Sequence, residues 1–106
     1  MIVVKNNILP FPGFKAMTVW PFIFVRSNNF DAIDENHESI HGRQQVEMLI
    51  IPFFLWYAIE WLLRSVFGSG NAYRKISFEC ESYDNEIDMN YLKNRRFWAF
   101  LKYMKR

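Results

Sequence analysis

The chain is poor in the residues that build small disulfide-stabilised or loop-rich proteins. Its 106 residues include one cysteine, four glycines and four prolines. Because Cys80 is alone, an internal disulfide framework is excluded, and a chain of this length needs a well-packed core or a bound metal for stability. The sequence contains no glycine-rich phosphate loop, serine nucleophile elbow, repeat or low-complexity tract. We therefore expect a single domain over residues 1–106.

An excess of one charge is also lacking, whereas aromatic residues are abundant. Thirteen Lys and Arg against eleven Asp and Glu give a net charge of +2, and no nucleic-acid-binding motif occurs, so we expect no nucleic-acid partner. The N-terminus does not follow the pattern of a secretory signal, and we expect a cytoplasmic protein. Aromatic residues make up 19% of the chain and hydrophobic residues 51%, which is enough to build a core from large side chains.

The chain has only two histidines, and both lie in one short motif, His-Glu-Ser-Ile-His at residues 37–41. On a helix, His37 and His41 stand one turn apart on the same face and can hold one ion, while Glu38 lies beside it. Neutral imidazole nitrogens suit Zn²⁺, and a neighbouring carboxylate can take a proton from a metal-bound water. We expect His37 and His41 as zinc ligands and Glu38 as general base. The alternative is a solvated helix face that carries two unconnected histidines.

The residues before the motif favour a helix around it. Candidate N-cap residues and first-turn acids are Asn28, Asn29, Asp31, Asp34 and Glu35. No proline or interior glycine interrupts residues 30–41, and we expect the helix to run to about Ile51. Pro52 lacks a backbone donor and disfavours helix in the residue before it, so it predicts a kink or a short break there.

A zinc site of this kind needs a third protein ligand. No further histidine exists, so the ligand is a carboxylate or Cys80. Residues 77–86 place three glutamates on a probable helix after a Gly-Ser-Gly-Asn turn, which returns the chain toward the first helix. Glu79 and Glu81 lie roughly 200° apart around that helix, so only one of them can face the metal.

The motif and the later glutamate helix together resemble the gluzincins, a clan of zinc metallopeptidases, and the length resembles their minimal single-domain form, the minigluzincins. The resemblance covers residues 17–92. It implies an α+β, zincin-like fold in which a short N-terminal hairpin or sheet packs on the active-site helix. A hydrophobic helix, a ligand helix and a C-terminal helix then follow. It also implies a Zn²⁺ cofactor and a peptide or protein substrate.

The same resemblance selects Glu79 as the third ligand, with Glu81 as the second choice. In the family the ligand glutamate opens a pattern that ends in an aspartate, which accepts a hydrogen bond from the first zinc-binding histidine. Tyr83 stands at that position here, so its phenol would make this contact. Tyr83, Tyr73 and Arg74 are also the candidates to stabilise an oxyanion. A different class of function stays open, namely a non-catalytic or latent zinc-stabilised interaction module.

Two segments of the first quarter of the chain predict strands, Met1–Val4 and Met17–Val25, separated by a turn at residues 10–13. Pro21 cannot donate to a sheet ladder, so the second strand is expected at an edge or a bulge. In zincin-like folds an extended substrate adds to the edge strand above the active-site helix. By that resemblance residues 17–26 would form the lip of the cleft.

Two further segments leave the sequence open between packing and membrane contact. Met48–Phe67 is apolar on nearly every helical face except at Glu60 and Arg64, which can pair. It suits a buried central helix, a helix embedded in a membrane interface or covered by a partner, or a true span. The basic stretch at residues 93–106 predicts an amphipathic helix that packs on the core or lies on an anionic membrane. In the packed arrangement Phe97, Leu101 and Met104 face the core.

Overall fold

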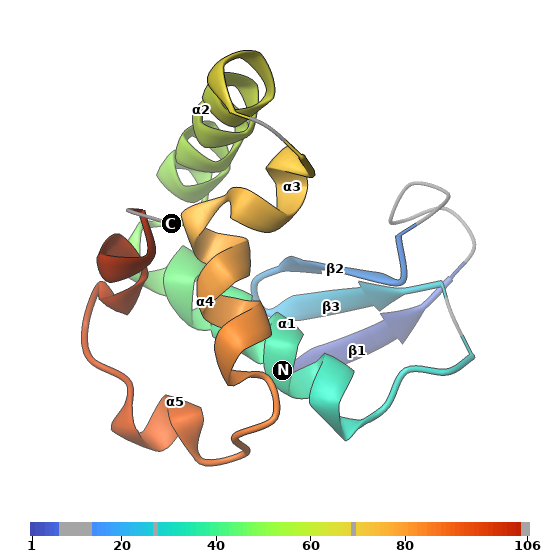
Figure 1. The fold of residues 1–106 in the computed structure, drawn as a ribbon. Coiled ribbons are helices and arrows are strands. Elements are labelled where there is room, and N and C mark those ends of the chain that lie inside the picture. Colours follow the sequence, from blue (N-terminus) through green and yellow to red (C-terminus); the bar gives the residue numbers. More distant parts are fainter. Residues whose placement is uncertain (7–13, 27, 69, 105–106) are drawn as a thin grey trace.

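The chain begins with a small sheet and continues as helices (Figure 1), so the expected α+β class is confirmed. The computed structural model describes residues 1–6, 14–26, 28–68 and 70–104. Within these ranges the strands are β1 (Ile2–Lys5), β2 (Ala16–Val19) and β3 (Phe22–Val25). The α-helices are α1 (Ala32–Glu47), α2 (Ile51–Phe67), α3 (Ala72–Lys75), α4 (Ser77–Asn85) and α5 (Tyr91–Asn94), followed by the 3₁₀ helix η1 (Ala99–Tyr103).

The sheet has the order β1-β3-β2, with β1 parallel and β2 antiparallel to β3. The expected single strand over residues 17–25 is wrong, because the chain turns at Trp20–Pro21 and returns as β3. Pro21 therefore lies in a turn, where its missing N–H costs no ladder hydrogen bond. Since β3 is central, β2 is an edge strand, and it contacts α1. The turn expected at residues 10–13 lies outside the described residues.

Local capping fixes the start of α1. The Asp31 carboxylate accepts from the Asp34 N–H at 2.9 Å, and the Asp34 carboxylate accepts from the Asp31 N–H at 3.1 Å. The expected end near Ile51 is wrong, because α1 stops at Glu47 and the next residues turn sharply. Pro52 then lies in the first turn of α2, where a residue without an N–H loses no helical hydrogen bond.

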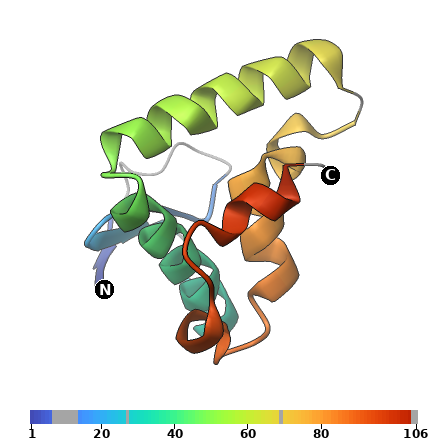
Figure 2. The ribbon, with the colours of Figure 1, turned by 90° about the vertical axis from the view of Figure 1, so that its left-hand side faces the viewer.

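The long helix α2 reaches across the top of the molecule (Figure 2). Only Phe53 and Glu60 of α2 are buried, so the expectation of a buried central helix is wrong for much of its surface. Glu60 accepts from the Ser77 N–H and hydroxyl at 2.7 and 2.5 Å, and it pairs with Arg64 at 3.5 Å as expected. Among the described residues no single helix is long and apolar enough to cross a membrane. By length and composition α1 and α2 pass that test only together, with a bend of 113°.

The hydrophobic core lies where α2, α4 and η1 meet, and it consists of Met48, Phe53, Ile76, Phe78 and Phe100. The expected C-terminal helix is instead two short helices, α5 and η1. Arg95, between them, is drawn into buried ion pairs with Glu47 and Glu81, and these long-range contacts override the local helical pattern. Consequently Phe97, Leu101 and Met104 are exposed, whereas Phe100 and Tyr103 face inward.

Candidate metal centre

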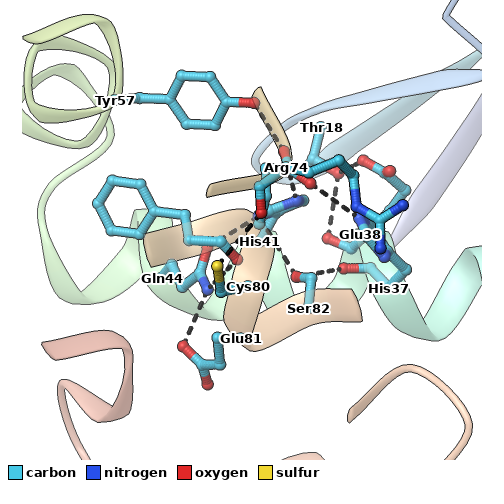
Figure 3. Close-up of polar contacts among 12 residues, drawn as sticks. Thr18, His37, Glu38, His41, Gln44, Tyr57, Arg74, Cys80, Glu81 and Ser82 are labelled. Carbon is cyan, nitrogen blue, oxygen red and sulfur yellow. Dashed lines mark hydrogen bonds and ion pairs between the residues drawn. The ribbon is translucent and has the colours of Figure 1, made fainter. Parts of the chain in front are cut away.

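Three of the residues singled out in the sequence meet between α1 and α4. Figure 3 labels two of them, His37 and His41. One ligand atom from each of His37, His41 and Glu79 can be chosen so that all lie within 4.8 Å of one another. Glu79 Oε1 is 3.2 Å from His37 Nε2, and Glu79 Oε2 is 3.1 Å from His41 Nε2. All three side chains are buried. The small, buried Ser82 donates to the His37 carbonyl at 3.2 Å, which allows α4 to approach α1 closely.

The outer nitrogens of both imidazoles face acceptors, which determines their tautomers. His37 Nδ1 lies 2.9 Å from Glu86 Oε1, and His41 Nδ1 lies 2.8 Å from Gln44 Oε1. The Gln44 amide has one orientation, because its nitrogen donates to the Phe78 carbonyl at 3.2 Å and to Glu81 at 2.9 Å. Both Nδ1 atoms therefore carry hydrogen, and in the neutral imidazoles both Nε2 lone pairs point toward Glu79.

Lone pairs that face a buried carboxylate repel it unless a cation lies between them. His41 Nε2 is buried, and the geometry of its 3.1 Å contact with Glu79 Oε2 is not that of a hydrogen bond. Burial alone would lower the pKa of His41, but the Glu79 carboxylate outweighs it and raises the pKa to about 9. Burial would likewise raise the pKa of Glu79, yet the two histidines hold it well below its usual range. The site thus attracts a proton or a metal ion, and two imidazoles with one carboxylate form a ligand set that suits Zn²⁺.

Glu38 lines the same cavity as His41 and Glu79, as the motif predicts for a residue beside the metal. Its Oε1 accepts from the Thr18 hydroxyl at 2.7 Å, so β2 holds the carboxylate in place. This cavity has a volume of about 330 Å³ and mostly apolar walls from β2 and α2, among them Met17 and Phe54. A second, more polar cavity of about 460 Å³ also reaches Glu38. Glu38 is therefore accessible from two sides.

The alternative ligands Glu81 and Cys80 do not join the histidines. The Glu81 carboxylate accepts from Arg95 and from the Tyr91 hydroxyl on the other side of α4. The Cys80 thiol donates to the Arg74 carbonyl at 3.2 Å. Of the two glutamates, only Glu79 faces the histidines, in agreement with the angular separation expected on a helix.

The expected contact between Tyr83 and the first histidine is corrected by the structure. The Tyr83 ring packs edge-on against the His37 ring, with 4.5 Å between their centroids, while Glu86 contacts His37 Nδ1. Glu86 follows Glu79 by seven residues, which is two helical turns and places both on one face. The Arg74 guanidinium lies 3.7 Å above the Tyr83 ring. Arg74, Tyr73 and Tyr83 all line the polar cavity, so they lie near the site as expected.

Tyr57 lies at the site but was not identified from the sequence, because its distance along the chain from the candidate ligands follows no helical or strand spacing. The Tyr57 hydroxyl donates to Glu79 Oε2 at 2.7 Å from α2, a separate helix (Figure 3). Burial and the nearby Glu79 charge raise the pKa values of Tyr57 and Tyr73 well above that of a free phenol. Both phenols therefore keep their protons at neutral pH and can act as hydrogen-bond donors. Gln44 and Glu86 were also missed, although each lies at helical spacing from a ligand.

Comparisons with known proteins add no assignment to this geometry. No family model matches the chain, and neither a curated protein nor a solved structure matches it. The resemblance to gluzincins stays a prediction based on the motif and on the glutamate helix.

Proposed function

We propose that this chain is a zinc-dependent metallopeptidase of the gluzincin type. The observation that carries the proposal is the convergence of the His37 and His41 Nε2 lone pairs on the Glu79 carboxylate inside a buried site. These three residues would hold the metal. When bound, zinc supplies a Lewis acid that polarises a scissile carbonyl and lowers the pKa of water.

The surrounding residues support this chemistry through separate roles. Glu38, held by Thr18, accepts the proton of the attacking water and passes it to the leaving amine. Glu86 and Gln44 keep the two imidazoles in the tautomer that ligates a metal. Tyr73, Tyr83 and Arg74 line the polar cavity and remain the candidates to stabilise the oxyanion.

A substrate would bind as an extended peptide along β2. Within the described residues β2 pairs as a strand with β3 alone. On its other edge the Thr18 carbonyl accepts from the Gln45 amide at 2.7 Å, so a peptide would form its backbone hydrogen bonds with the part of the edge before that carbonyl, at Ala16. Ala16, Met17 and Thr18 of this strand line the apolar cavity, which would receive a side chain of the bound peptide. This assignment moves the lip of the cleft from residues 17–26 to β2, because β3 is central in the sheet.

A zinc-stabilised module that binds a partner without cleaving it is the second candidate. The observation that favours it is the large exposed apolar surface of α2, which a small peptidase does not need. Zinc would then stabilise the fold, since two helices and the metal would form one unit. Both functions require the metal, so zinc content does not distinguish them. Only the peptidase would hydrolyse a peptide, and a hydrolysis assay therefore separates the two functions.

Zinc content per chain is the first test. We expect about one zinc in the wild type purified without added metal, and loss of zinc in His37→Ala and in Glu79→Gln. Glu35→Gln, which changes an exposed glutamate in the first turn of the same helix as His37, is the matched control and should keep its zinc. A wild type that stays free of zinc after reconstitution would reject both candidate functions.

Glu38→Gln then tests catalysis directly. The amide keeps an oxygen that can accept from Thr18 but cannot take up a proton from water. We expect unchanged zinc content and a fall in peptide hydrolysis of about 100-fold or more, the range for loss of a general base. Hydrolysis assays with a peptide mixture measure this. Retained activity in the variant would reject the mechanism, and a zinc-bearing wild type that cleaves no peptide would favour the non-catalytic module.

A further inference from the structure

Among the described residues, five charged side chains line the polar cavity beside the candidate metal centre, and four of them have a partner within the chain. Lys15 Nζ lies 2.6 Å from Asp34 Oδ2. Glu38 accepts from a threonine hydroxyl of β2, and Glu86 Oε1 lies 2.9 Å from Nδ1 of the first motif histidine. The fifth charged side chain is Arg74.

Arg74 differs from the other four because its neighbour is an aromatic ring. Its guanidinium lies 3.7 Å from the centroid of the Tyr83 ring, and in the described part of the chain it has no carboxylate within ion-pair distance. The residue is exposed. A guanidinium that lies on an aromatic ring keeps N–H donors at its edge, and these donors match the two oxygens of a carboxylate. Arg74 therefore offers a site for a planar anion such as a carboxylate.

Arg74 also lies close to the candidate ligands. The Tyr83 ring, which contacts its guanidinium, packs against the His37 ring with 4.5 Å between the centroids. Figure 3 shows the Arg74 side chain extending from α3 toward His37. Consecutive Cα atoms of a peptide are about 3.8 Å apart. A group on the residue next to the scissile bond can therefore reach Arg74 while the bond itself lies beside His37.

An amino group is the other ligand that this cavity could attract, because three of its five charged side chains are acidic. Each acid, however, already has a donor beside it, namely a lysine, a threonine hydroxyl and an imidazole. A metal ion at the candidate ligands would add positive charge next to the same cavity, which favours an anion. Binding of a carboxylate to Arg74 breaks no ion pair of the described residues, whereas an amino group would compete with the existing donors.

We propose that Arg74 binds a carboxylate of the peptide substrate in the polar cavity, so that the chain selects peptides with a negative charge beside the scissile bond. This inference rests on the proposed peptidase function. Two sources supply the carboxylate: the C-terminus, when the last residue is released, or an aspartate or glutamate side chain within the peptide. In both cases water adds across one peptide bond, with its hydroxyl on the carbonyl carbon and its proton on the leaving nitrogen. Tyr73 and Tyr83 then remain the candidates for the oxyanion.

Peptide binding to the zinc-loaded Glu38→Gln variant tests the proposal without turnover. The neutral probe is the peptide Ala-Ala-Phe-Ala with an acetylated N-terminus and an amidated C-terminus. Three further probes each add one charge to it: a free C-terminus, a glutamate as the last residue, or a free N-terminus. By calorimetry we expect the free acid or the glutamate peptide, depending on the source of the carboxylate, to bind about tenfold tighter than the neutral peptide. Equal binding of all four, binding of none, or tightest binding by the peptide with the free N-terminus would overturn the proposal.

Substitutions of Arg74 assign this preference to its side chain. In the same background, Arg74→Gln should bind the charged and the neutral peptide equally, because the amide has no charge. Arg74→Lys keeps the charge without the planar fork and should retain part of the preference. The matched control is Arg43→Gln, which changes an exposed arginine of α1 that lines neither cavity, and it should keep the full preference. A preference that survives in Arg74→Gln would overturn the proposal.

Hydrolysis of the same peptides by the wild-type chain separates this proposal from the proposed function. We expect a KM about tenfold lower for the charged peptide than for the neutral one, and Arg74→Gln should abolish this difference. A role of Arg74 at the oxyanion would instead lower kcat for every peptide and leave the ratio of KM values unchanged, which would overturn the proposal. Cleavage of charged and neutral peptides with equal KM would reject the carboxylate site and keep the peptidase function. Selective binding without cleavage would reject the peptidase function while the carboxylate site would stand.

Discussion

Two glutamates on α4, only two residues apart, have opposite surroundings. Glu79 faces His37 and His41, whereas Glu81 faces the Arg95 guanidinium and the Gln44 amide. Each carboxylate also accepts from a tyrosine hydroxyl, Glu79 from α2 at 2.7 Å and Glu81 from α5 at 2.6 Å. Both side chains are buried. The two carboxylates differ in the group beside them. Glu81 has a guanidinium, whereas Glu79 has two imidazoles that can take up a proton or a metal ion.

That difference explains why one glutamate suits a metal and the other does not. Arg95 carries a permanent charge and several donors in a fixed geometry, and it binds Glu47 as well as Glu81. Its ion pairs tie the segment after α5 to α1 and α4, which is a structural role. The histidines opposite Glu79 instead present nitrogens that can hold either a proton or a metal ion, so the cation at this site is exchangeable. One face of α4 thus stabilises the fold, while the other face offers a site.

The largest expected effect contrasts Glu81→Gln with Glu79→Gln. The first change leaves the inaccessible Arg95 side chain with one carboxylate and places an amide donor among other donors, which should cost about 3 kcal/mol or more of the free energy of unfolding. The second change removes the carboxylate that keeps His41 protonated, so the imidazole becomes neutral and can accept from the new amide. We expect it to cost about 1.5 kcal/mol in the metal-free protein, about half as much as Glu81→Gln.

Urea unfolding of the metal-free proteins and zinc titration together measure this contrast. Glu79→Gln should lose zinc with the smaller loss of stability, while Glu81→Gln should lose more stability and bind zinc wherever it is folded. A Glu79→Gln protein that is as unstable as Glu81→Gln would show that both glutamates are structural. The comparison between the two faces of α4 would then be wrong.

Gln44 connects the two faces and gives the second prediction. Its oxygen accepts from His41 Nδ1, and its nitrogen donates to Glu81. Gln44→Leu should weaken zinc binding by about 10- to 100-fold, since the imidazole loses the partner that orients it. The control is Gln45→Leu, a neighbouring buried amide that contacts β2 and Trp20 and no candidate ligand.

Zinc titration against a competing chelator reads out both glutamine variants. Each loses a buried amide of the same size from α1, so a general loosening of the helix affects both. An equal loss of zinc affinity in Gln45→Leu would therefore contradict a specific role for Gln44 in orienting His41.

Elements with local signals were predicted correctly from the sequence. The start of α1 follows from the capping side chain of Asp31, and α4 lies within residues 77–86, where a helix was expected. The single strand over residues 17–25 and the single C-terminal helix were wrong. In the first case a continuous apolar run hid the turn at Pro21, and in the second the distant partners of Arg95 decided the local conformation. Such long-range contacts cannot be read from local periodicity.

The residues of the candidate site also fall into those that a local pattern predicts and those that only long-range packing brings in. Spacing brought out His37, Glu38 and His41, and the resemblance selected Glu79, which the structure brings together with both histidines. The seven-residue interval to Glu86 was a readable signal for the partner of His37, but the family pattern pointed to Tyr83 instead. Tyr57 could not be found, because nothing in the sequence relates a residue of α2 to a ligand on α4.

The smallest expected effect compares the two tyrosines, one on each face of α4. Tyr57→Phe and Tyr91→Phe each remove one hydrogen bond to a buried carboxylate, and each should cost about 1.5 kcal/mol of the free energy of unfolding. Only Tyr57→Phe should change the zinc affinity, because its hydroxyl binds the candidate ligand. Urea unfolding and chelator competition measure both quantities. If Tyr91→Phe weakens zinc binding as much as Tyr57→Phe does, the network through Gln44 transmits changes from the structural face to the candidate metal site.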